Sequence, residues 1–390
     1  MPLDVLIVDD SHFFQHRLTE MLNDHPDLNV IGVASNGREA VDKAKELKPD
    51  LITMDYEMPV MDGVSAIRQI MADRPVPIMM FSSLTYEGAK TTLDALEAGA
   101  VDFLPKNFAE ISKNSEALKK KLHNRLLSIA KGASSAASRP KVRLAPAEKP
   151  ATTKTTSERS TQDVRGKSSL SRDSGSLSKG ARTDLSSAQS ENYRPARTKP
   201  LNKASLKLVA IGASTGGPVA LTDVLTKLPS NFPLPIVLTQ HMPENFTKAF
   251  AERLNRQCQI QVKEAEDGDS LRPGLALLAP GGKQMMIDRR NSVKILPGDD
   301  RTNYKPSVDI TFGSAANAYG AEVLAIVLTG MGSDGCEGAR LLKQRGATIW
   351  GQDEASCVIY GMPMAVARAN LTDQVLSLKD IGPKLAKELN

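Results

Sequence analysis

Cysteine is scarce in this sequence, and its copies lie far apart. The 390 residues include three cysteines, Cys258, Cys336 and Cys357. They form no Cys-x-x-Cys pair and no cluster with histidine, so the sequence predicts neither a zinc site nor a disulfide framework. A chain without disulfides is typical of a reducing compartment, and we therefore expect a cytoplasmic protein.

Two kinds of membrane signal are also missing from the sequence. It has no charged amino-terminal segment followed by an apolar one, as a signal peptide would have, and no apolar run of membrane length. We therefore expect no direct insertion into a membrane. We also expect the protein to act as a monomer.

Positive charge is concentrated in one stretch. Residues 131–200 hold 15 Lys and Arg against 6 Asp and Glu, whereas the net charge of the whole chain is only +5. The same residues contain no Ile, Met, Phe, Trp or Cys, so they cannot bury enough apolar surface to offset the entropy of ordering. We interpret residues 129–204 as a disordered, basic, Ser/Thr-rich linker. The excess charge then belongs to a tether, and we expect no nucleic-acid partner.

The linker separates two folded parts, residues 1–128 and 205–390. In both parts short apolar runs alternate with stretches of helical periodicity, which predicts the α/β class with two doubly wound parallel-sheet domains. Five strand–helix units in the first part indicate a flavodoxin-like sheet. The strands expected there are Val5–Val8, Val30–Ala34, Leu51–Met54, Ile78–Phe81 and Phe103–Leu104. Those expected in the second part, after a first apolar run at 206–213, are Pro235–Thr239, Leu275–Leu278, Val323–Leu328 and Ala347–Trp350.

Polar side chains gather where the strands of the first part end. Asp9 and Asp10 follow the first strand, and Asp55 ends the third. Three carboxylates held together repel one another and require a cation, and ligand sets made only of oxygen suit Mg²⁺. Ser82 and Lys106 end the fourth and fifth strands, and a hydroxyl and an ammonium there can neutralise a phosphoryl group carried on one carboxylate.

The first part resembles the receiver domain of bacterial response regulators over its whole length. The matching segments are LIVDDS (6–11), ITMDYEMPVMDG (52–63) and LPK (104–106), together with Ser82. The resemblance implies phosphorylation by a histidine kinase, with Mg²⁺ as cofactor. The implied roles are phosphoryl acceptor for Asp55, Mg²⁺ ligands for Asp10, Asp55 and the Glu57 carbonyl, assistance through water for Asp9, phosphoryl contacts for Ser82 and Lys106, and aromatic switch for Phe103.

A glycine-rich turn follows the first apolar run of the second part. It holds Ser214 between Gly212 and Gly216. Glycines permit positive φ and remove side-chain bulk, so a ligand or a strained serine can come close to backbone N–H groups. The turn is equally typical of a phosphate-binding loop or a plain strand–helix turn, and these interpretations stay open on the turn alone.

Histidine is nearly absent from the later two thirds of the chain. His241 is the only histidine in residues 124–390, and it lies just after the predicted strand Pro235–Thr239. A serine nucleophile requires a base within hydrogen-bond distance. His241 is the candidate for that base, although a lone histidine is more often a packing or surface residue.

The group that would orient this base is less well defined by the sequence. Asp334 stands out because the strand Val323–Leu328 leads directly into the glycine-rich turn 329–335, whose backbone N–H groups can serve as oxyanion donors. An Asp-Gly pair is also an ordinary turn signature. The other candidate carboxylates are Asp299, Asp300 and Asp309.

Residues 206–370 resemble the catalytic domain of the chemotaxis-receptor methylesterases. The matching segments are IGASTGGP (211–218), QHMP (240–243), PSVD (306–309), LTGMGSDG (328–335) and IYGMP (359–363). The resemblance implies Ser214 as nucleophile, His241 as general base and Asp334 as orienting carboxylate. It also implies the backbone N–H of Met331 as oxyanion donor, and we add Thr215 as a second candidate donor.

Together the two resemblances imply a phosphorylation-activated serine hydrolase. It would demethylate glutamate methyl esters on the cytoplasmic helices of chemoreceptors and also deamidate glutamines there, with no cofactor in the esterase domain. The alternatives are a non-enzymatic phospho-switch adaptor and a response regulator that binds DNA. The α/β pattern after residue 206 disfavours the latter because it contains no recognisable helix-turn-helix.

Overall fold

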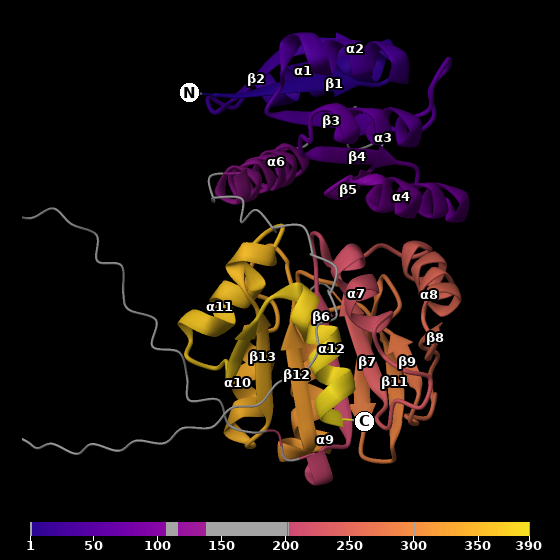
Figure 1. Cartoon of the computed structure of the whole chain (residues 1–390), viewed down its shortest axis with the longest axis vertical. Coiled ribbons are helices and arrows are strands. Elements are labelled where there is room, and N and C mark those ends of the chain that lie inside the picture. Colours follow the sequence, from indigo (N-terminus) through magenta and orange to yellow (C-terminus); the bar gives the residue numbers. More distant parts are fainter. Residues whose placement is uncertain (1, 107–115, 138–200, 202, 300–301, 390) are drawn as a thin grey trace, which may run out of the picture. The chain divides into compact units, whose positions relative to one another are not determined.

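The computed structural model describes residues 2–106, 116–137, 201, 203–299 and 302–389 (Figure 1). These described residues belong to one compact unit. The prediction of a disordered linker falls almost wholly on residues outside the described ranges. None of the helices in these ranges combines the length and the apolar character that a membrane crossing needs.

The first part contains a five-stranded parallel sheet in the order β2-β1-β3-β4-β5. This order is that of the flavodoxin-like fold, which confirms the prediction. The strands are β1 (Leu3–Val8), β2 (Leu28–Ala34), β3 (Leu51–Asp55), β4 (Ile78–Ser82) and β5 (Asp102–Pro105). The helices are α1 (His12–Asn23), α2 (Gly37–Leu47), α3 (Gly63–Asp73), α4 (Tyr86–Ala98) and α6 (Glu116–Ala137).

Both faces of this sheet are buried because helices cover each of them. Successive side chains of a strand point to opposite faces, so neighbouring residues of β1 enter different apolar clusters. Val5 and Ile7 of β1 belong to the apolar cluster that includes α1 and α6. Leu6 and Val8 belong to the cluster that includes α2, α3 and α4. A continuous apolar run, as in β1, is what burial on both faces requires.

The second part contains a seven-stranded parallel sheet in the order β14-β13-β12-β6-β7-β9-β8. Its strands are β6 (Leu208–Ala213), β7 (Ile236–Gln240), β8 (Gln261–Glu264), β9 (Leu275–Leu278), β12 (Val323–Val327), β13 (Thr348–Gln352) and β14 (Gln374–Leu376). The α-helices are α7 (Gly217–Leu225), α8 (Phe246–Gln257), α9 (Val308–Ala318), α10 (Cys336–Gln344), α11 (Met362–Arg368) and α12 (Leu378–Leu389). In Figure 1, β6, β7, β12 and β13 lie side by side within this part.

Helices cover both faces of this second sheet. Val209 and Ile211 of β6 belong to the cluster that includes α7, α8 and α12. Leu208 and Ala210 belong to the cluster that includes α9, α10 and α11. Both sheets are therefore doubly wound, and the expected fold class is confirmed.

The position of β6 in this sheet decides where a ligand can bind. From β6 the chain continues to β7 on one side, whereas β12 pairs with β6 on the other side. The strand order reverses at this point, and open parallel sheets bind ligands at such a switch point, beyond the carboxyl ends of the strands.

Some elements differ from the prediction. An antiparallel hairpin, β10 (Lys283–Asp288) with β11 (Ser292–Pro297), was not predicted, and neither were the edge strands β8 and β14. Helix α6 continues to Ala137, past residue 129 at which the linker was expected to begin. It does so because Ile129 and Ala130 are still buried in the core of the first part.

Candidate functional site

Three neighbouring strands of the second sheet carry the candidate esterase residues at their carboxyl ends. Ser214 directly follows β6, and His241 directly follows β7. Asp334 lies in the turn that follows β12, just before α10. Because β12, β6 and β7 are neighbours, these three side chains meet at one edge of the sheet.

The three side chains form a continuous hydrogen-bonded chain. The Ser214 hydroxyl lies 3.1 Å from Nδ1 of His241, and Nε2 of His241 lies 2.6 Å from Oδ2 of Asp334. A neutral imidazole that donates its Nε2–H to Asp334 has Nδ1 free to accept the serine proton. The contacts therefore fit an arrangement of nucleophile, base and orienting carboxylate.

Asp334 is held by backbone N–H groups as well as by histidine. Its Oδ2 accepts from the backbone N–H of Val308 at 2.7 Å, and its Oδ1 accepts from Ser307 Oγ at 2.9 Å and from Asp309 N–H at 3.0 Å. Burial acts to raise the pKa of Asp334, but the hydrogen bond and charge of His241, with the amides of α9, outweigh it and lower the pKa. Asp334 is therefore an anion fixed at both oxygens.

The turn after β12 comes very close to the candidate nucleophile. A Cβ atom on Gly330 would lie 2.8 Å from Cβ of Ser214 and 2.3 Å from Sδ of Met362, so only glycine fits there. Met331 follows in this turn and lines a cavity of about 400 Å³ together with Ser214, Thr215 and His241. Both candidate oxyanion residues therefore adjoin the same cavity as the candidate nucleophile.

Sequence reasoning missed three residues around this site. Tyr304 stacks on the imidazole of His241, and Ser307 donates to Asp334. The side-chain amide of Gln240 donates to the backbone carbonyl of Ser214 at 2.9 Å and to that of His241 at 3.2 Å. Gln240 and Ser307 lie in QHMP and PSVD, two of the segments that resemble the methylesterase family. That resemblance was the signal that could have identified them. Tyr304 lies in none of these segments and follows no predicted strand, so nothing in the sequence marked it as a site residue.

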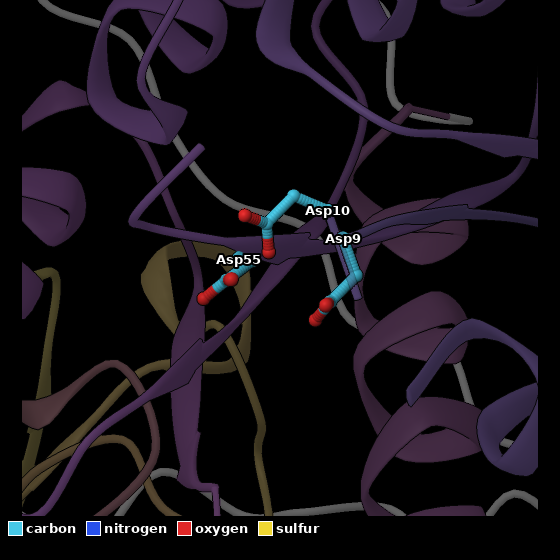
Figure 2. Close-up of side chains that lie close together, drawn as sticks. All are labelled: Asp9, Asp10 and Asp55. Carbon is cyan, nitrogen blue, oxygen red and sulfur yellow. The ribbon is translucent and has the colours of Figure 1, made fainter. Parts of the chain in front are cut away.

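The second candidate site lies at the carboxyl edge of the first sheet. Oxygens of Asp9, Asp10 and Asp55 lie within 4.8 Å of one another. Figure 2 shows these three side chains grouped together. Nζ of Lys106 lies 2.6 Å from Asp55 Oδ2 and 2.7 Å from Asp9 Oδ2. Four of the residues predicted to form the phosphorylation site are thus brought together.

The electrostatics of this acidic cluster fit a cation. Burial raises the pKa of Asp55 to about 6, although the charge and hydrogen bond of Lys106 oppose the shift. Burial also raises the pKa of Asp9, again against Lys106. Burial thus makes the charged form of both carboxylates costly, and a divalent ion with oxygen ligands would offset that cost.

The remaining predicted residues of this site lie at different distances from the cluster. Glu57 lines the same surface pocket as Asp10. The Ser82 hydroxyl bonds to the backbone carbonyl of Gly88 at 3.1 Å and receives a hydrogen bond from Thr92. It is therefore engaged within β4 and α4 rather than with Asp55. Phe103 is buried and stacks on Phe246, with ring centroids 4.6 Å apart.

A flavodoxin-like domain with an acidic edge, followed by an α/β domain with a Ser–His–Asp edge, defines a response regulator that carries a hydrolase-type domain. Comparison with known families agrees with this class. Residues 5–118 match the family described as response regulator receiver domain, and residues 209–385 match the family described as CheB methylesterase. The chain belongs to the CheB methylesterase family.

Relatives that match this chain over nearly its whole length are named for two activities, protein-glutamate methylesterase and protein-glutamine glutaminase. The chain is 54% identical to the protein-glutamate methylesterase/protein-glutamine glutaminase 1 of Saccharophagus degradans, over 100% of both chains. It is 59% identical to the corresponding enzyme of the group 1 operon of Pseudomonas putida, over 99% of both. Among solved structures, the Thermotoga maritima CheB methylesterase catalytic domain is 41% identical, with a TM-score of 0.45, and the match covers 47% of this chain and 98% of that one.

Proposed function

We propose that this protein hydrolyses glutamate γ-methyl esters on the cytoplasmic helices of chemoreceptors and deamidates glutamines there. The observation that carries the proposal is the hydrogen-bonded chain from Ser214 through His241 to Asp334 at the switch point of the second sheet. Family membership and the names of the full-length relatives support the substrate class. The reaction takes place in the cytoplasm, where those receptor helices lie.

In the proposed mechanism the Ser214 hydroxyl attacks the ester carbonyl while Nδ1 of His241 takes its proton. The imidazolium that forms is stabilised by Asp334 through the Nε2–H bond. The backbone N–H of Met331, with Thr215 as a second donor, stabilises the negative oxygen of the tetrahedral intermediate. These groups need no metal or organic cofactor.

The intermediate collapses when the C–O bond to the methoxy group breaks. Methanol leaves with the proton from Nδ1 of His241, and a glutamyl ester on Ser214 remains. A water molecule then attacks this ester and gives a proton to His241, and the bond to Ser214 Oγ breaks as His241 returns that proton to Oγ, which releases the receptor glutamate and free Ser214. With a glutamine substrate the first leaving group is ammonia instead of methanol.

The receiver domain supplies the signal. We propose that a histidine kinase donates a phosphoryl group to Asp55, and that Asp10, Asp55 and the carbonyl of Glu57 hold Mg²⁺, with Asp9 acting through water. A bound divalent cation offsets the negative charge of the incoming phosphoryl group. Lys106 lies close enough to Asp55 to contact a phosphoryl oxygen, whereas Ser82 must turn away from Gly88 to do so.

Contacts between the two domains suggest how the signal reaches the esterase. Oγ1 of Thr215, next to Ser214, donates to Oδ2 of Asp102 at 2.7 Å, and Arg125 pairs with the same oxygen at 2.8 Å. Phe103 and Arg125 also line the cavity beside Ser214. We infer that the unphosphorylated receiver restricts access to Ser214 and that phosphorylation of Asp55 loosens these contacts.

The test is methanol release from membranes that carry methylated chemoreceptors, with and without acetyl phosphate as phosphodonor. We expect Ser214→Ala to lose at least about 10³-fold in rate, because the nucleophile is gone. Ser230→Ala, in an exposed loop before β7, is the matched control and should keep the rate. Acetyl phosphate should activate the wild type and leave Asp55→Asn unchanged. Normal methanol release by Ser214→Ala would overturn the proposed chemistry and favour a non-enzymatic adaptor.

A further inference from the structure

Two helices of the esterase domain exchange carboxylates at their N-termini. Asp334, which directly precedes the N-cap of α10, accepts hydrogen bonds from the first amides of α9, those of Val308 and Asp309. Asp309, in the first turn of α9, accepts from the amides of Gly335 at 2.9 Å and Gly338 at 2.7 Å, at the start of α10. Two N–H groups at the start of each helix are therefore satisfied by a carboxylate at the start of the other.

Neither helix has a cap of its own. The N-cap residue of α9 is Ser307, whose hydroxyl bonds to Asp334 instead of to its own helix, and the N-cap residue of α10 is Gly335, which has no side chain. Unsatisfied amides at a helix start need an acceptor, and loss of a cap destabilises the helix. The mutual capping by Asp334 and Asp309 is thus required locally.

The two helices also pack too closely for these partners to be replaced by water. A Cβ atom on Gly338 would lie 3.0 Å from Cα of Asp309 and 2.5 Å from Cβ of Phe312. The backbone of α10 therefore lies directly against α9 where Asp309 reaches it. Asp309 fixes the distance between the helix starts on both sides of Asp334.

We propose that Asp309 is a positioning residue of the esterase site, which holds the turn carrying Asp334 in register with His241. This inference rests on the proposed hydrolase function. Asp309 bonds to the amide of Gly335, the residue that follows Asp334 in the chain. Without that bond the turn can move, and the 2.6 Å contact from Asp334 to Nε2 of His241 is the first to lengthen.

The charge of Asp309 acts on the same contact. Burial, together with the neighbouring Asp334 carboxylate, raises the pKa of Asp309 to about 6 against the opposing effect of the Gly338 and Gly335 amides. The titratable groups that face it are Asp334 from the turn, Cys336 from α10 and, beyond Asp334, His241. Ionised Asp309 adds negative charge behind Asp334 and so favours the imidazolium that forms in the reaction.

The experiment compares three substitutions at this position in the full-length protein, with methanol release as the assay. In Asp309→Asn the amide oxygen still accepts both N–H groups, so we expect kcat within about threefold of wild type. Removal of the charge should move the acid limb of the pH–rate profile to lower pH. Asp309→Ala and Asp309→Glu remove or displace the cap, and a misplacement of about 1 Å predicts a loss of about 10- to 100-fold in kcat with little change in KM.

The matched control is Asp373→Ala. Asp373 also binds a backbone amide in this domain, that of Ile349 at 2.8 Å, but at the start of β13, the edge of the sheet away from Ser214. It should lose stability and keep kcat. Wild-type kcat in Asp309→Ala, or an equal loss in Asp373→Ala, would overturn the positioning role.

A spectroscopic readout separates this inference from the proposed reaction. The proton on Nε2 of His241 that bonds to Asp334 should give a strongly downfield resonance, which can be assigned by ¹⁵N-histidine labelling because the chain has five histidines. We expect the resonance to shift upfield in Asp309→Ala and Asp309→Glu and to persist in Asp309→Asn. An unchanged resonance in all three variants would overturn the inference. This readout needs no methanol release, so it tests the inference separately from the hydrolase proposal.

Discussion

The aromatic ring of Tyr304 lies flat against the imidazole of His241, with centroids 4.0 Å apart and planes 7° from parallel. Stacking at this distance restricts rotation of the imidazole, so Nδ1 stays directed at Ser214 and Nε2 at Asp334. The face of an aromatic ring also attracts a cation, which favours the imidazolium that forms when Ser214 is deprotonated. In the proposed mechanism Tyr304 would therefore act on the base His241 without touching the proton that is transferred.

Replacement of Tyr304 tests this relationship. We expect Tyr304→Leu to lower kcat by about 2- to 10-fold, because the cation–π contribution is lost. The acid limb of the pH–rate profile should move to lower pH. Tyr304→Phe keeps the stacked face and should stay close to wild type in both measurements. An equal loss in Phe and Leu would assign the effect to the hydroxyl instead of the ring.

The buried charge of Asp55 predicts a pH-dependent stability of the receiver. Its pKa is about 6 in the folded state, above the ordinary value of 3.8, so the folded state binds the proton more tightly. The free energy of unfolding therefore falls as pH rises from about 4 to about 6, and above that range the cost amounts to about 1–3 kcal/mol. Asp55→Asn should stabilise the receiver at pH 7 by this amount and have little effect at pH 4.

Urea unfolding of the receiver transition at the two pH values measures this difference. Asp42→Asn, on an exposed part of α2, is the control and should change little at either pH. Because Mg²⁺ offsets the same charge, it should stabilise the wild type at pH 7 and have a smaller effect on Asp55→Asn. A variant less stable than wild type at pH 7 would show that Asp55 is not held under electrostatic strain.

Val60 is held in an unfavourable backbone conformation beside this acidic cluster. Its φ is +69°, its side chain is 85% exposed, and the amide of Met61 bonds to the carbonyl of Pro59 across it at 2.7 Å. Such a turn with positive φ at its centre is strained, particularly for a β-branched residue. Val60→Gly should raise the free energy of unfolding of the receiver by about 0.5–1 kcal/mol, since relief of strain exceeds the added chain entropy. Val60→Ile keeps the strain and should show no gain in the same urea titration.

Gly330 leaves no room for a side chain beside Ser214. Gly330→Ala would place a methyl group 2.8 Å from Cβ of Ser214, so we expect the serine to be displaced and kcat to fall by about 10- to 100-fold. Gly313→Ala, inside α9, meets only the flexible end of Leu341 at 3.3 Å and serves as the control. It should keep kcat and gain about 0.5 kcal/mol in stability, because alanine is the better helix former. Wild-type methanol release by Gly330→Ala would show that the turn after β12 can shift to accommodate the methyl group without displacing Ser214.

The central strands could be predicted from the sequence because a strand that is buried on both faces is a continuous apolar run. β6 and β12 are continuous apolar runs, and all their residues are buried. The edge strands β8 and β14 are short and only partly buried, and neither contains an apolar run longer than two residues. Their pairing depends on neighbours that are distant in the sequence.

A similar division applies to the site. Ser214, His241 and Asp334 could be predicted because each follows a recognisable strand, and parallel strands bring their ends together. Tyr304 lies in an irregular segment between β11 and α9, and nothing local indicates that its ring reaches His241. Asp309 could be predicted only as one candidate among several, because its role depends on the packing of α9 against α10, which local sequence does not encode.

Through the hydrogen bond from Thr215 to Asp102, a change at the Ser214 site can also affect the receiver. Any coupling between two binding sites is reciprocal. If phosphorylation changes the affinity of the Ser214 site by some factor, binding at the Ser214 site changes the phosphorylation equilibrium of Asp55 by the same factor. Under the proposed regulation, a receptor helix bound at Ser214 would favour the phosphorylated form of Asp55 by the same factor. Methylated receptors would then act as substrates and also shift the phosphorylation equilibrium of Asp55 toward the phosphorylated form.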